Sequence, residues 1–146
     1  MPSETLTRTA SSPASSPDVW RALQSPETWQ GIAGVDEVTA PRHDEEGRLS
    51  GFGFTTRIGG RPYRGTATRA AAVDGQSVRW DVKTPELAGA LEVELRSAAE
   101  GTEVTVTLTF ASVGMMSSMF FPMVVSSVGS EFPDAVDRFA LKLGAD

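Results

Sequence analysis

Residues 115–143 read MMSSMFFPMVVSSVGSEFPDAVDRFALKL and contain the chain's one long segment with a helical apolar period. Apolar side chains recur there at steps of three or four, which places them on one stripe of a helix. They are Phe121, Val125, Val128, Phe132, Val136, Phe139 and Leu143. Between Val35 and Phe110 the pattern alternates instead, as it does in strands. The sequence therefore predicts one long C-terminal helix against one curved antiparallel sheet.

The start of this helix holds a cluster of methionine and phenylalanine: Met115, Met116, Met119, Phe120, Phe121 and Met123. Methionine is flexible and polarizable, so it adapts to irregular surroundings. Two interpretations stay open. The cluster fills the core at the end of the sheet, or it lines or gates a hydrophobic cavity.

Pro133 predicts an interruption of the same helix, because a proline ring collides with the carbonyl four residues earlier, here that of Gly129. We expect the helix to kink there or to split. In a split helix Ser130 caps a second piece, and Pro133 sits in its first turn. The apolar stripe is continuous in both cases.

The composition predicts a single domain covering residues 1–146. A net charge of −6 and a pI near 4.8 argue against a nucleic-acid partner, because neutralising phosphates requires a basic surface. The chain has no cysteine, which excludes disulfides and thiolate chemistry. The first residues lack the apolar run of a signal peptide, and Met119–Val125 is too short to cross a bilayer. We therefore expect a cytoplasmic protein without stable membrane insertion.

A first strand is expected at Glu4–Thr9, followed by a short helix. Ser16 has the features of its N-cap, with Pro17 at the first helical position. Asp18 then complements the helix dipole in the first turn, and the helix is predicted to end near Gln24.

A second short helix is expected after Ser25-Pro26, which repeats the start signal. It should carry Trp29 and Ile32 and end at Gly34.

Six further strands are predicted to form a meander: Val35–Thr39, Leu49–Ile58, Tyr63–Val73, Val78–Val82, Leu91–Arg96 and Val104–Phe110. Turns are expected between strands at His43–Gly47, Gly59-Gly60, Asp74-Gly75 and Glu100-Gly101. Such a sheet has one wet face and one apolar face. The fold class is therefore α+β, with about seven antiparallel strands wrapped around a long helix. One helix stripe leaves part of the concave side unfilled, and we expect that space to be a ligand cavity.

Three stretches carry a family resemblance: Pro17–Leu23, Ser25–Trp29 with Gly34-Val35 after it, and Glu100–Val106. The first two look like the helical opening of the polyketide cyclase/dehydrase and lipid-transport branch of the START/Bet v 1-like superfamily, also called SRPBCC. The third resembles the strand before its final helix. The element order is similar to that superfamily's helix-grip fold over nearly the whole chain. These motifs are structural rather than catalytic, so they indicate a fold and not an activity.

The resemblance implies a hydrophobic cavity between the sheet and the long helix. Members of the superfamily bind lipids, polyketides, sterol-like or aromatic compounds, and some are cyclases or dehydratases. The predicted ligand-binding residues are Trp29, Phe52, Phe54, Tyr63, Arg69, Trp80, Phe110, Met115, Met119, Phe120 and Met123. No cofactor is implied, because the glycine pairs lie in a hairpin and not before a helix.

Catalytic candidates are few. Tyr63 is a possible hydrogen-bond donor, and an inward arginine could meet a ligand carboxylate or enolate. Strand parity favours Arg69, although a bulge near Ala70–Ala72 would place Arg64 inside instead.

His43 stands in a charged turn, so neither a catalytic triad nor a histidine metal site has support. The neighbouring carboxylates Asp44, Glu45 and Glu46 lack the spacing of a calcium loop. We expect them to be solvated, and we expect no metal site.

Three functions stay open from the sequence. The favoured hypothesis is a non-catalytic protein, monomeric or homodimeric, that binds a small hydrophobic or aromatic molecule. The second is a polyketide cyclase or dehydratase in which Tyr63 and an inward arginine polarise a carbonyl. The third is a protein-interaction or stress-associated module with a vestigial cavity, in which Met115–Met123 could mediate dimerisation.

Overall fold

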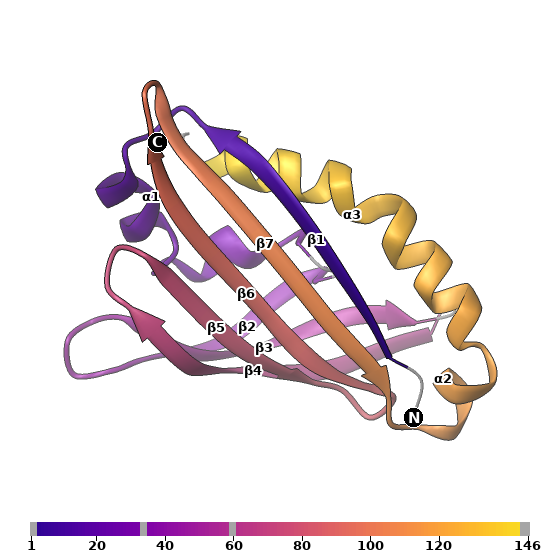
Figure 1. The fold of residues 1–146 in the computed structure, drawn as a ribbon. Coiled ribbons are helices and arrows are strands. Elements are labelled where there is room, and N and C mark those ends of the chain that lie inside the picture. The colour runs from indigo at the N-terminus through magenta and orange to yellow at the C-terminus, as the bar shows by residue number, and fades with distance from the viewer. Residues whose placement is uncertain (1–2, 33–34, 59–60, 144–146) are drawn as a thin grey trace.

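The computed structural model describes residues 3–32, 35–58 and 61–143, which form one curved sheet with a long helix across its open side (Figure 1). The strands are β1 (Ser3–Ser12), β2 (Glu37–His43), β3 (Leu49–Ile58), β4 (Arg61–Val73), β5 (Ser77–Lys83), β6 (Leu87–Ala98) and β7 (Gly101–Ser112). The helices are α1 (Ser16–Ala22), the 3₁₀ helix η1 (Pro26–Trp29), α2 (Met115–Met119) and α3 (Phe121–Leu143).

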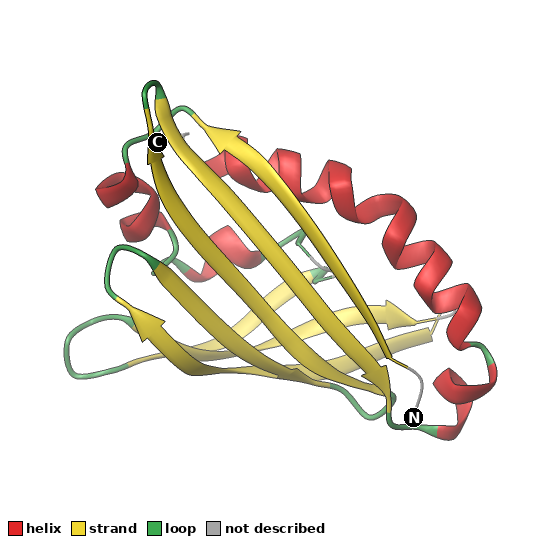
Figure 2. Ribbon diagram, in the orientation of Figure 1, coloured by secondary structure: helices red, strands yellow, loops and turns green. Residues whose placement is uncertain are grey.

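The strand order is β1-β7-β6-β5-β4-β3-β2, and each neighbouring pair is antiparallel. This arrangement confirms the predicted meander, with β1 joining β7 at one edge. The connections β2–β3, β4–β5 and β6–β7 lie at the end of the sheet that carries α1, which we call the α1 end (Figure 2). Strands β3, β5 and β7 finish at the opposite end beside α2, which we call the α2 end. Gly34, Gly59 and Gly60 lie outside the described residues.

The apolar face of the sheet follows the predicted alternation. Its buried side chains are Phe52, Phe54, Ala67, Val78, Trp80, Leu91, Val93, Val104, Val106, Leu108 and Phe110. The opposite face carries paired threonine hydroxyls, such as those of Thr9 on β1 and Thr105 on β7, which lie 2.9 Å apart. This division between faces fixes the register of the whole sheet, because a slip of one residue would turn every apolar side chain toward water.

The C-terminal helix is interrupted at a different place from the one predicted. The helical conformation is interrupted at Phe120, between α2 and α3, and α3 then continues without interruption through Pro133. The predicted split with Ser130 as a cap is therefore wrong, and the Ser130 hydroxyl donates to the Ser127 carbonyl within the helix at 3.0 Å. Pro122 occupies the first turn of α3, where a missing N–H costs no hydrogen bond.

The two short helices also differ in detail from the prediction. Ser15, not Ser16, caps α1, because its hydroxyl accepts from the Asp18 amide at 3.4 Å. The Ser16 hydroxyl instead bonds that of Ser97 at 2.9 Å. The second helix is the single 3₁₀ turn η1, and Ile32 lies beyond it although it is buried as expected.

Polar contacts fix α3 to the sheet and to η1. Arg8 on β1 donates two hydrogen bonds to Asp137, at 3.1 and 2.9 Å. Near the helix C-terminus, Lys142 Nζ donates to the Glu27 carbonyl at 2.6 Å.

Within the described residues, no helix is long and apolar enough to cross a membrane.

We predict that Phe139→Ala lowers the free energy of unfolding by about 3–5 kcal/mol, because it leaves a cavity in a closely packed aromatic core. Phe139 is 3% exposed, whereas Leu141 two positions along is 62% exposed. The control Leu141→Ala should change stability by about 0.5 kcal/mol or less. Urea denaturation measures both, and equal losses would contradict the orientation described for α3.

Candidate functional site

Four aromatic rings from four elements meet at the centre of the core. Trp29 of η1 lies 5.4 Å from Trp80 and 5.5 Å from Phe139, measured between ring centroids. Phe52 completes the group, 5.3 Å from Trp80 and 6.4 Å from Trp29. Tilted and edge-on pairs at these distances are attractive beyond their buried area. The predicted wall residues Trp29, Phe52 and Trp80 are therefore in mutual contact.

A small internal cavity of about 50 Å³ remains beside this aromatic group. Its lining is apolar throughout: Trp29, Ile32, Val35, Phe52, Phe54, Ala67, Trp80, Val82, Leu91 and Leu108. Four of these were predicted, and the sequence analysis missed the other six. The strand alternation could have identified Ala67, Val82, Leu91 and Leu108, because each shares the inner face with a predicted residue.

The two cavity tryptophans differ in their hydrogen bonding. Trp29 Nε1 donates to the Leu23 carbonyl at 3.0 Å. Trp80 Nε1 is buried and has no hydrogen-bond partner among the described residues. Trp80 itself is 1% exposed. A buried donor without an acceptor costs about 1–3 kcal/mol, so this N–H is a candidate contact for an oxygen inside the cavity.

Phe54 narrows the cavity from the β3 side. Its ring lies over Gly65, its partner across the β3–β4 ladder. A Cβ at Gly65 would collide with the edge of the Phe54 ring and would come within 2.9 Å of the Lys83 carbonyl oxygen, closer than real contacts allow. Glycine is therefore needed here for Phe54 to pack flat. Movement of this one ring would open space above β4.

Two predicted aromatic residues lie away from the cavity. Phe110 is buried, but its ring packs against Phe121 at the start of α3, 5.7 Å between centroids. Tyr63 is half-buried on the inner face of β4, close to the α2 end. Neither residue lines the cavity in this structure.

The predicted methionine wall lies on the surface instead. Met115, Met119, Phe120 and Met123 are all exposed, and none of them lines the internal cavity. For Met123 the cause is the phase of α3, which turns Phe121 and Val124 toward the core and Met123 outward. These four residues are an exposed apolar cluster.

Arg69 is on the inner face of β4, in the phase predicted for a regular strand. The bulge lies just after it, between Arg69 and Ala71, so Arg64 stays on the outer face. The guanidinium does not reach the cavity. It donates to the Leu49 carbonyl at 3.0 Å and to Asp44 Oδ2 at 2.8 Å.

Asp44 is the centre of a hydrogen-bond network in the β2–β3 loop. Its Oδ1 accepts from the Glu46 and Arg48 amides, both at 2.9 Å. The hydrogen bond from Arg69 is the main cause that lowers the pKa of Asp44 to about 2, and the Arg48 amide adds to it. The sequence analysis expected Asp44 to be solvated, but the structure uses it to tie the loop to β4.

The remaining loop residues show no site. His43 is the last residue of β2 rather than part of the turn, and it is exposed. Glu45 and Glu46 are exposed as expected. No group of three potential metal ligands occurs in the described part of the chain.

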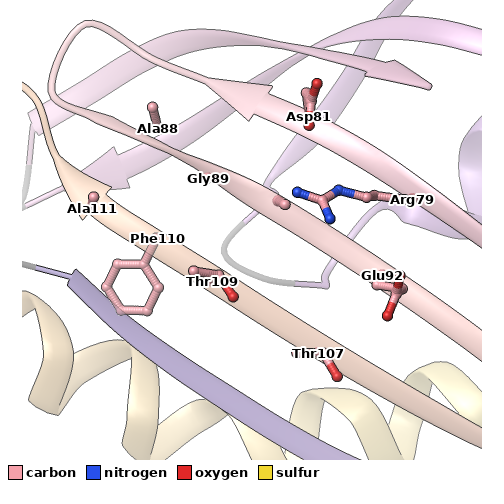
Figure 3. A pocket seen from close by; sticks show the side chains of 10 residues that line it. Arg79, Asp81, Ala88, Gly89, Glu92, Thr107, Thr109, Phe110 and Ala111 are labelled. Carbon is pink, nitrogen blue, oxygen red and sulfur yellow. The ribbon is translucent and has the colours of Figure 1, made fainter. Parts of the chain in front are cut away.

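A second depression, of about 320 Å³, lies on the outer face of β5, β6 and β7 (Figure 3). Small residues such as Ala88 and Ala90 leave room between the longer side chains of Arg79, Asp81 and Glu92, which face solvent. Farther along β6, a hydrogen bond with Glu92 raises the pKa of Glu94. This depression has no buried polar group, so the internal cavity is the better candidate site.

The comparisons with known proteins bear on the family and the fold. The family model described as polyketide cyclase / dehydrase and lipid transport matches residues 3–144. The chain belongs to this family. A search of curated proteins finds no match.

Several solved structures superpose on almost the full length of this chain. The Zhui aromatase/cyclase from Streptomyces sp. R1128 has a TM-score of 0.70 at 13% identity, covering 95% of this chain and 94% of its own. A START superfamily protein from Mycobacterium smegmatis has a TM-score of 0.70 at 10% identity, with coverages of 91% and 94%. A protein from Thermus thermophilus, TTHA0849, has a TM-score of 0.72 at 16% identity, with coverages of 98% and 97%. These similarities establish the helix-grip fold.

We predict that the protein loses the stabilising contribution of ionised Asp44 as the pH falls from about 4 to about 2. A carboxyl group whose pKa is lowered by folding stabilises the folded state while ionised, and protonation removes this contribution as the pH falls through the folded pKa. Asp44→Asn should therefore lower stability at neutral pH and flatten the acid branch of the stability curve. Denaturation at a series of pH values measures this.

The matched control for this experiment is Glu45→Gln, in the same loop and exposed. Arg69→Met should raise the pKa of Asp44 toward that of an ordinary aspartate, as followed by carboxyl NMR titration. An unchanged pKa in Arg69→Met would contradict the assigned cause.

Proposed function

We propose that the protein binds a small, mostly apolar molecule that carries one hydrogen-bond acceptor, with Trp80 Nε1 as the donor. The observation that carries this proposal is a buried indole N–H without an acceptor among the described residues, on a side chain that lines an aromatic cavity. A ligand carbonyl, ether or phenol oxygen would satisfy that N–H, and the apolar walls would accept the rest of the molecule.

The small volume of the cavity limits the size of the ligand that it can hold. A cavity of about 50 Å³ can hold water, whereas a cavity of about 150 Å³ is known to hold benzene. A ligand with one or two rings therefore requires the walls to separate. Phe54 is the side chain best placed to move, because it covers Gly65 and stands at the edge of the aromatic group.

The lining favours binding over catalysis. None of the residues around the cavity is ionisable, so the site lacks a general acid or base. Tyr63 and Arg69 share the inner face of β4 but are separated by six positions, or about 20 Å along the strand. They are too far apart to polarise one carbonyl together, which removes the main support for a cyclase or dehydratase. That function therefore ranks below ligand binding.

One observation favours the interaction module as a second candidate. The core is nearly filled, and the apolar cluster on α2 is exposed, as a module with a vestigial cavity would require. Uptake of a ligand by the interior would favour the binding protein, and its absence would favour the interaction module.

We predict that the protein binds α-tetralone about five- to tenfold more tightly than tetralin, which has the same rings without the oxygen. Trp80→Phe keeps an aromatic wall but removes the donor, so the two affinities should become equal. Isothermal titration calorimetry measures both ligands. Trp20→Phe, on the half-buried α1 tryptophan, is the matched control. A preference for the ketone that survives Trp80→Phe would exclude Trp80 as the donor.

We further predict that Phe54→Ala binds α-tetralone more tightly than the wild type, because truncation enlarges the cavity that the ligand must otherwise open. The same change should lower the free energy of unfolding by about 3–5 kcal/mol. Phe120→Ala, at an exposed phenylalanine, should alter neither quantity. Failure of both the wild type and Phe54→Ala to bind either probe would move the assignment to the interaction module.

A further inference from the structure

Two residues with hydroxyl groups lie opposite each other on the inner face of the sheet, toward its α2 end. The antiparallel ladder pairs Thr56 of β3 with Tyr63 of β4. Thr56 is on the inner face because it continues the alternation of Phe52 and Phe54 along β3. Residues directly opposite in such a ladder have Cβ atoms about 5 Å apart, so the two side chains border the same space.

Among the described residues, no group makes a hydrogen bond with the side-chain hydroxyl of Thr56 or of Tyr63. This is unusual for Thr56, which is only 9% exposed. The similarly buried Thr28, by contrast, donates to the Ala22 carbonyl at 2.6 Å. The Thr56 oxygen is not completely enclosed, unlike Trp80 Nε1, so a bound molecule can reach it. Thr56 and Tyr63 therefore offer hydrogen-bonding groups that the fold itself does not use.

The Phe54 ring separates this hydroxyl pair from the internal cavity. Along the inner face of β4, Ala67 lines the cavity and Gly65 lies under the Phe54 ring. Tyr63 is the next inward residue, and its partner Thr56 follows Phe54 on β3. Movement of the ring away from Gly65 would therefore join the cavity to the hydroxyl pair. The four positions from Ala67 to Tyr63 span about 13 Å, which suits a molecule of two linked rings.

The hydroxyl pair lies between charges of opposite sign. Asp36, whose amide donates to the Thr55 carbonyl at 2.8 Å, is exposed on the β2 side. Arg61, two positions before Tyr63, is exposed on the β4 side. With one charge of each sign beside the pair, neither an anionic nor a cationic ligand group is favoured. A neutral hydroxyl or carbonyl suits this position, because each protein hydroxyl can donate or accept.

We infer that the ligand is elongated and carries a polar group at each end: an acceptor at Trp80 Nε1, and a neutral hydroxyl or carbonyl at Thr56 and Tyr63. The inference rests on the proposed function and adds a second binding position to it. The apolar middle of the ligand lies over Gly65, in the space that the Phe54 ring occupies without ligand. Tyr63 is then a ligand-binding residue at the far end of the site.

The test compares two probes by isothermal titration calorimetry. Both 4-phenylcyclohexanone and 4-(4-hydroxyphenyl)cyclohexanone carry the ketone, and only the second adds a phenol hydroxyl at the opposite end. The wild type should bind the phenol about five- to tenfold more tightly. In the isosteric variant Thr56→Val/Tyr63→Phe the two affinities should become equal. α-Tetralone, which is too short to reach the pair, should bind this variant as it binds the wild type, which also verifies that the cavity is intact.

The matched control is Thr66→Val, at an exposed threonine on the outer face of β4, which should keep the preference for the phenol. Trp80→Phe should weaken both probes and keep that preference, because the two ends of the ligand bind separately. Equal binding of the two probes by the wild type, or a preference that survives Thr56→Val/Tyr63→Phe, would overturn this inference. The proposed function would then stand on the tighter binding of α-tetralone than of tetralin. Absence of binding by every ketone would overturn both.

Discussion

The structure depends on the position of the Trp29 ring. This ring belongs to a single turn of 3₁₀ helix, is fully buried, and contacts Phe52 of β3, Trp80 of β5 and Phe139 of α3. Its N–H is satisfied by the Leu23 carbonyl, which fixes the orientation of the indole. One side chain thus joins the short helices, the middle of the sheet and the C-terminal half of the long helix.

The same aromatic packing limits the proposed binding site. By filling the centre of the concave face, the rings leave about 50 Å³, and they leave the Trp80 N–H without an acceptor among the described residues. Stability and ligand binding therefore compete for the same volume. Gly65 is the residue at which this competition is most direct, because its missing Cβ lets the Phe54 ring pack over the cavity.

Local patterns predicted most of the fold. Strand alternation and turn residues such as Asp74-Gly75 act over a few positions, and they placed the meander and the inner face correctly. The break at Phe120 was missed because Pro122 and Pro133 give the same local signal, and only the first occupies a helix start. Cavity volume, the exposure of Met119 and the pairing of Arg69 with Asp44 depend on packing between distant segments. No short pattern contains that information, which is why only part of the predicted wall lines the cavity.

The most direct test of the account is the Trp80 indole N–H resonance in ¹⁵N-labelled protein during titration with α-tetralone. The account predicts that this resonance moves downfield as its N–H gains an acceptor, while that of Trp29, already bonded to Leu23, stays nearly fixed. Saturable binding that leaves the Trp80 resonance in place would contradict it, because the ligand would then occupy another part of the molecule.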